Sequence, residues 1–168
     1  MVESLVVALW LPANFTAVQS TPFKHVRSEE SHVRTLIADG YVRSATLKEL
    51  VDTVEALSCV VYIATAVKLS QGMQGALLHS LAGSRETPIL RVLVKTNLSG
   101  DEAIAVIAHE LQHVIEAVRG TQGAAASGAT AAFDTLDPTA RASGDRKYET
   151  AMAVAVTAKV RKELKKAP

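Results

Sequence analysis

Internal disulfide bonds are the first feature that the sequence excludes, because Cys59 is the only cysteine among 168 residues. It lies in the apolar run 59–63, where we expect a buried structural thiol. A reactive thiolate would need an electropositive, partly open site. An excess of charge is also lacking, since 18 Lys and Arg face 17 Asp and Glu. Nucleic-acid binders usually carry a concentrated basic surface, so we expect no nucleic-acid partner.

Long hydrophobic runs are absent as well. The N-terminal apolar run extends only from Leu5 to Leu11, whereas a membrane-spanning helix needs about 20 residues. Together with residues 12–20 it resembles a secretory signal, but Met1 to Ser4 contain no Lys or Arg. Two interpretations stay open for residues 1–20. A signal-like segment would make the protein secreted or periplasmic, and a first strand or short helix would suit a cytoplasmic protein.

Residues 21–168 are expected to form a single domain, with helices at both ends. Apolar spacing predicts a helix over 28–38 that ends at Gly40. The pattern Thr46 to Glu49 is a capping box that predicts the start of a second helix. Another capping box, Ser99 to Glu102, predicts a helix over 101–119 that ends at Gly120. A loop over 120–145 and a final helix over 146–165 follow.

The middle of the chain predicts a small sheet. Residues 58–67, 76–82 and 89–96 are short runs rich in apolar residues and are bounded by glycine or proline. The link over 83–88 is short enough for a hairpin. The expected fold class is therefore α+β, with N-terminal helices, a short, mostly antiparallel sheet and two C-terminal helices.

The helix over 101–119 carries the sequence His-Glu-x-x-His at residues 109–113. Residues four apart share one face of a helix, so His109 and His113 can converge on one zinc ion. Glu110 lies beside them and is placed to take a proton from a water that the metal activates. The predicted cofactor is Zn²⁺, with Glu110 as the catalytic base.

A third ligand is needed for a catalytic zinc, and two glutamates are candidates. Glu116 shares the histidine face, but it lies about 7 Å further along the axis at 1.5 Å per residue, which favours a salt-bridging role. Glu149 continues the apolar stripe of the final helix toward Ala153 and Val156. A carboxylate on a buried stripe needs a partner, so Glu149 is the preferred ligand.

These residues resemble the gluzincin type of zinc metallopeptidase, in which two histidines of one helix and a glutamate of a following helix bind zinc. The chain also resembles small uncharacterised bacterial proteins predicted to be secreted, through residues 108–113 and the step Tyr148-Glu149-Thr150. The resemblance implies a small zincin-like domain and a peptide or protein substrate. If the resemblance holds, the strand over 89–96 could form the edge along which a peptide lies, but the sequence does not show which strand is the edge.

Two other interpretations remain. One is a non-catalytic, zinc-stabilised domain that binds a partner, although structural zinc sites usually have four ligands, often cysteines, and only one cysteine is present. The other is a plain α+β domain in which the motif is fortuitous. The sequence gives no indication of substrate specificity or oligomeric state.

Overall fold

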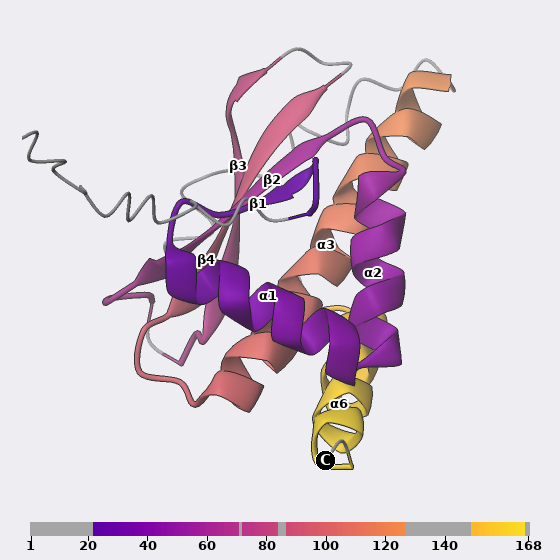
Figure 1. The fold of residues 1–168 in the computed structure, drawn as a ribbon. Helices are drawn as coiled ribbons and strands as arrows, with labels where there is room; N and C mark the ends of the chain where they lie inside the picture. Colours follow the sequence, from indigo (N-terminus) through magenta and orange to yellow (C-terminus); the bar gives the residue numbers. More distant parts are fainter. Residues whose placement is uncertain (1–21, 71, 84–86, 127–148, 167–168) are drawn as a thin grey trace, which may run out of the picture.

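The structure, a computed structural model, describes residues 22–70, 72–83, 87–126 and 149–166. Two predicted features, the signal-like segment over 1–20 and most of the loop over 120–145, lie outside these ranges. The elements, in chain order, are β1 (Val26–Arg27), α1 (Ser31–Arg43), α2 (Ala45–Glu55), β2 (Val60–Ala66), β3 (Gly75–Gly83), β4 (Pro88–Lys95), α3 (Gly100–Ala126) and α6 (Ala151–Leu164). Helices and a small sheet in this arrangement confirm the predicted α+β class (Figure 1).

The four described strands form one mixed sheet in the order β1-β2-β4-β3. Only β3 and β4 pair antiparallel, whereas β2 pairs parallel with both β1 and β4. The expectation of a mostly antiparallel sheet was therefore wrong. The short link between β3 and β4 correctly predicted their hairpin, but no local signal shows that β4 inserts between β2 and β3. This insertion makes β3, and not β4, the edge strand on that side.

One face of the sheet is buried beneath the helices. Along β2 and β4, buried and partly exposed residues alternate, as the period of a strand requires. Val61, Ile63 and Val92 lie on the covered face, while Tyr62 and Arg91 point to the other. Helices α1, α2 and α3 lie against the covered face in Figure 1. The molecule is thus built from two layers around a shared core.

The N-terminal helices begin and end at other residues than predicted. Helix α1 passes through Gly40 and ends at Arg43. A Cβ on Gly40 would lie 2.5 Å from Leu47 Cδ2 and 2.6 Å from Ile104 Cγ2, so this glycine permits a close helix contact and does not end the helix. The N-cap of α2 is Ser44, whose side chain accepts a hydrogen bond from the Leu47 amide, and not Thr46.

Helix α3 continues past Gly120 to Ala126, so the predicted stop was also wrong. At its start, the Glu102 amide donates to Ser99 Oγ at 3.4 Å, which is half of the predicted capping box. The Glu102 carboxylate does not complete the box, because it pairs with Arg161 of α6 instead. An ion pair with Arg161 on the neighbouring helix therefore takes the place of the expected contact between the Glu102 carboxylate and the Ser99 amide.

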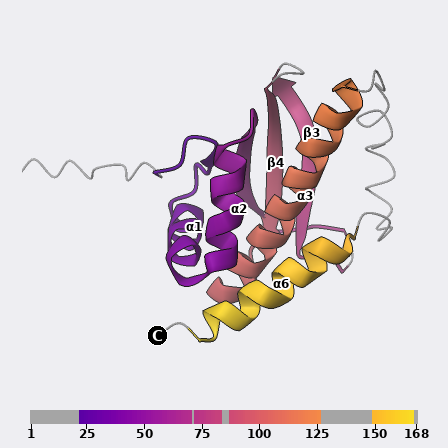
Figure 2. The same ribbon diagram turned by 90° about the vertical axis from the view of Figure 1, so that its right-hand side faces the viewer.

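Helix α6 crosses α3 obliquely, as Figure 2 shows, and packs chiefly against it. Thr150 is its N-cap, because the Thr150 side chain accepts from the Ala153 amide. The side that faces the protein consists of Ala153, Val156, Val160 and Leu164, all buried. The predicted buried stripe of the final helix is therefore confirmed from Ala153 onward.

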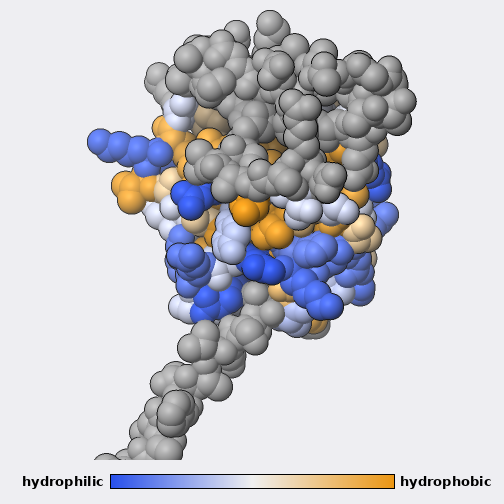
Figure 3. All heavy atoms as spheres, turned by 90° about the horizontal axis from the view of Figure 1, so that it is seen from above, coloured by the Kyte–Doolittle hydropathy of each residue, from blue (hydrophilic) through white to orange (hydrophobic). Residues whose placement is uncertain are grey.

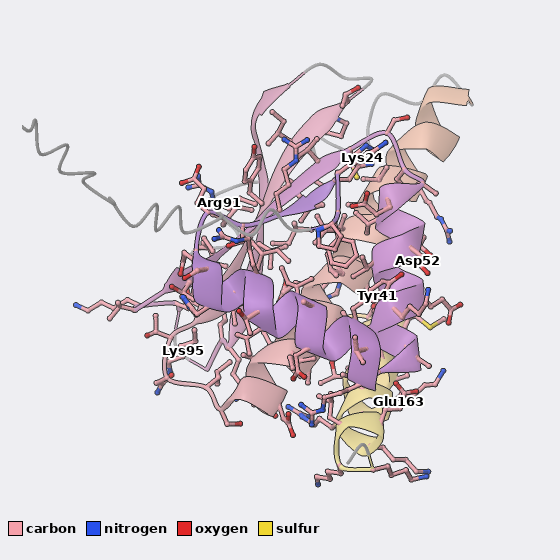
Figure 4. All side chains as sticks on the ribbon, viewed as in Figure 1. Lys24, Tyr41, Asp52, Arg91, Lys95 and Glu163 are labelled. Carbon is pink, nitrogen blue, oxygen red and sulfur yellow. The ribbon has the colours of Figure 1, made fainter. Side chains whose placement is uncertain are left out.

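The described surface carries both polar and apolar side chains (Figure 3). On the outer side of the helices, Tyr41 of α1 donates to Asp52 of α2 at 2.7 Å, and the two labelled residues lie close together in Figure 4. Lys48 completes this group with a contact of 2.5 Å to Asp52. Among the described helices, none has a segment long and apolar enough to span a bilayer.

Candidate metal centre

The middle of α3 brings the two motif histidines together. His109 Nε2 and His113 Nε2 are 3.1 Å apart, and the rings meet edge to face with their centroids separated by 4.7 Å. The side chains of His109 and His113 are only 18% and 16% exposed, and Ala108 and Leu111 of the same helical turn are fully buried. The helical spacing thus places two nitrogen donors at one point at the edge of the core.

Glu149 is the residue just before the N-cap of α6, and its carboxylate lies near the histidine pair. Its Oε1 atom is 3.6 Å from His109 Nε2, and its side chain is 48% exposed. The expectation that Glu149 continues the buried stripe of the last helix was wrong, because Thr150 starts the helix after it. Glu149 therefore approaches the histidines from the residue just before the N-cap of α6, and not from a packed helical position.

Glu116 takes the other side of His113. Its Oε2 atom is 3.3 Å from His113 Nδ1, the nitrogen that points away from His109. Its Oε1 atom accepts from Gln112 Nε2 at 2.9 Å and from Thr150 Oγ1 at 3.0 Å. Both carboxylate oxygens of Glu116 already have partners, which corresponds to a salt-bridging position and leaves Glu149 as the better placed candidate for a third ligand.

Thr157 of α6 is a site residue that the sequence analysis did not identify. Its Oγ1 atom lies 2.9 Å from His109 Nδ1. The same oxygen donates to the Ala153 carbonyl at 2.8 Å. The signal that could have revealed it is its place beside the buried residue Val156, where a polar side chain needs a partner.

Glu110 points toward the sheet and is almost fully buried, with 5% of its surface exposed. A Cβ on Gly75, at the start of β3, would lie 2.5 Å from Glu110 Oε1. The glycine therefore lets the edge strand pass directly over the carboxylate. Burial, and secondarily the charge of Glu149, raise the pKa of Glu110 to about 8. Carboxyl groups with such a perturbed pKa are found often at functional sites, and Glu110 directly follows one of the two motif histidines in the sequence.

His109 is perturbed in the opposite direction. Burial is the largest cause that lowers its pKa, and the neighbouring His113 adds to this effect. The Glu149 carboxylate and the Ala153 backbone act against it. Both causes of the lower pKa favour a neutral imidazole, which is the form that ligates metal ions.

The remaining predicted features lie away from this centre or outside the described residues. Cys59 is fully buried, and burial raises its pKa to about 11, as expected for a structural thiol. His32 pairs with Glu30 at 3.4 Å, far along the chain from the motif. Tyr148 lies outside the described ranges. Within those ranges, no set of three or more His, Cys, Asp or Glu side chains is already arranged around one metal position.

Comparison with known proteins adds no assignment: the chain matches no protein-family model, no curated protein and no solved structure. The function can therefore be inferred only from the geometry of the chain itself.

Proposed function

We propose that the protein is a zinc-dependent hydrolase, most simply a peptidase of the gluzincin type. In this proposal His109, His113 and Glu149 bind the metal, and Glu110 is the general base. The observation that carries it is the 3.1 Å distance between the two Nε2 atoms. Two nitrogens at 2.0–2.1 Å from a tetrahedral zinc lie about 3.3 Å apart, so the histidine pair fits one zinc with little adjustment.

The third ligand requires a small movement. Glu149 Oε1 is near His109 Nε2 but is not yet part of a three-residue set. Its side chain is 48% exposed, and a rotation toward the point between the two rings would bring its carboxylate to the metal position. A set of two histidines and one glutamate leaves a fourth position for water, which is the arrangement of catalytic and not of structural zinc sites.

The chemistry follows from the residues around that position. A bound zinc lowers the pKa of a coordinated water to about 7 and polarises a carbonyl group. In this proposal Glu110 would take the proton of the attacking water and would return it to the leaving nitrogen when the C–N bond of the peptide breaks. A nearby positive charge lowers the pKa of a carboxyl group, so the metal favours the ionised Glu110 that this role needs.

The edge strand offers a place for an extended substrate. Among the described strands β3 is the outer one on the side of α3, and it passes over Glu110 at Gly75. An extended peptide can add to an exposed edge through backbone hydrogen bonds. The peptide would lie along β3, and not along the strand over 89–96 that the sequence analysis considered, because β4 is internal.

Metal analysis and a matched set of variants test this function. Protein purified without added zinc should contain about one zinc per chain. The double variant His109→Ala/His113→Ala should lose it, whereas His32→Ala, which replaces an exposed histidine, should not. Against a broad peptide library, Glu110→Gln should keep the zinc and lose about 10²- to 10⁴-fold in activity. Glu49→Gln, an exposed glutamate of α2, is its control.

The outcomes separate the alternatives. Zinc in the wild-type protein without turnover of any peptide would favour a zinc-stabilised binding domain. Protein without zinc that also fails to take up added zinc would leave a fortuitous motif. Full activity of Glu110→Gln would overturn the proposed mechanism while leaving the metal site intact.

A further inference from the structure

We infer that Thr157 and Glu116 are positioning residues that hold the rings of His109 and His113 with a proton on Nδ1, so that both Nε2 lone pairs point to one site. The inference deepens the proposed zinc site and rests on it for its functional meaning. Neither residue belongs to the His-Glu-x-x-His motif, and neither contacts the metal position directly.

The hydroxyl of Thr157 fixes the first ring. A threonine has a single hydroxyl hydrogen, and Thr157 donates it to the Ala153 carbonyl at 2.8 Å. At its second contact, 2.9 Å from His109 Nδ1, the oxygen can therefore only accept. The proton of this hydrogen bond belongs to Nδ1 of His109, and its Nε2 atom is left with a free lone pair.

The carboxylate of Glu116 fixes the second ring in the same way. The Thr150 oxygen accepts the Ala153 amide at 3.1 Å, so its hydrogen is available for Glu116 Oε1. Gln112 Nε2 donates to the same oxygen. An ionised carboxylate only accepts, so His113 Nδ1 must donate to Glu116 Oε2. The Nε2 atom of His113 is then also unprotonated.

The two assignments have one consequence at the centre. Two lone pairs face each other across 3.1 Å, which is unfavourable unless a cation lies between them. Histidines that bind metals almost always donate their other ring N–H to an oxygen, and the loss of this partner weakens metal binding by about 10- to 100-fold. Helix α6 supplies Thr157 directly and Thr150 through Glu116, so its docking on α3 prepares both ligands.

Thr157→Val tests the first assignment, because it keeps the shape of the side chain and removes the oxygen. Zinc affinity measured by chelator competition should fall about 10- to 100-fold. Thr157→Ser restores the oxygen and should restore most of the affinity. The matched control is Thr53→Val in α2, since Thr53 is also half-buried and donates to the carbonyl four residues earlier, at 2.7 Å, but lies on another helix. It should leave the affinity unchanged.

A direct readout of the proton completes the test. Ring ¹⁵N shifts of the metal-free protein should show a protonated Nδ1 on His109, lost or averaged in Thr157→Val, and on His113, altered in Glu116→Gln. The cobalt-substituted absorption spectrum should change in the same two variants and not in Thr53→Val. Equal zinc affinities of Thr157→Val and Thr53→Val, or an Nδ1 of His109 without a proton, would overturn the inference. If the wild type binds no zinc, the proposed function fails, while the ring shifts still decide the tautomers.

Discussion

Two glutamates, Glu163 and Glu110, lie in different regions of the protein, and their pKa values are shifted in opposite directions. Glu163 of α6 lies near the N-terminus of α2 (Figure 4) and accepts hydrogen bonds from Ser44 Oγ at 2.6 Å, from Thr46 N at 3.1 Å and from Thr46 Oγ1 at 2.8 Å. Burial acts to raise its pKa, but these hydrogen bonds outweigh it and lower the pKa. Glu110 of α3 is more deeply buried, and its pKa is raised to about 8.

The difference separates a structural carboxylate from a functional one. At the α2–α6 contact, the donors are supplied by a helix start, so the charged form stabilises the fold. At the α3–β3 contact, the fold keeps a carboxyl group where its charge is unfavourable without a cation. Natural proteins place such unfavourable groups mainly at sites where they act. This contrast supports the site proposed around Glu110 and leads to three predictions.

The largest effect is expected in the pH dependence of the free energy of unfolding, when the wild type and Glu110→Gln are compared as metal-free proteins. Between pH 4.5 and 8 the unfolded chain releases the Glu110 proton and the folded chain retains it, so the free energy of unfolding falls as pH rises through this window. The difference between 4.5 and about 8 corresponds to roughly 5 kcal/mol at most. Urea unfolding in EDTA at pH 5 and pH 8 should show this loss in the wild type and not in Glu110→Gln. Parallel losses in both proteins would remove the contrast.

The same glycine substitution should act differently in the two regions. Gly40→Ala places a methyl group against Leu47 and Ile104, and should lower the free energy of unfolding by about 1–3 kcal/mol without changing zinc affinity. Gly75→Ala places it against Glu110 and Val106, and should displace the carboxylate and reduce hydrolysis. Chemical unfolding and peptide turnover, measured on both variants, check this. A Gly75→Ala protein with unchanged turnover would mean that β3 does not position Glu110.

The smallest effect is expected for Glu163→Gln. Loss of the charged acceptor should lower the free energy of unfolding by about 1–2 kcal/mol at pH 7. The pKa of Glu163 is lowered in the fold, so its contribution is present above the unfolded value near 4.5 and disappears as pH falls through the folded value. Thermal melts of the two proteins from pH 7 to pH 3 should therefore converge in acid. A constant difference across this range would show that packing, and not charge, is lost.

Local patterns in the sequence identified the features that depend on neighbours along the chain. The four-residue spacing of His109 and His113 placed two donors on one face of a helix, and the alternating burial of β2 and β4 follows from strand periodicity. The apolar stripe of the last helix was also correct from Ala153 onward. Each of these is set by backbone geometry within a few residues.

Contacts between distant segments decided the features that the sequence missed. Ser44, and not Thr46, caps α2 beside Glu163, and Glu102 pairs with Arg161 and not with its own helix start. The insertion of β4 between β2 and β3 set the edge strand. Thr157 and Glu149 reach His109 from more than 35 residues away.

The sequence by itself determined that an α+β chain would carry two convergent histidines on α3, because helical periodicity is a local property. Only the tertiary structure decided which strand borders Glu110 and which side chains of α6 meet the two rings. Those choices depend on how helices and strands pack, and packing energy is shared among residues that no short stretch of sequence contains.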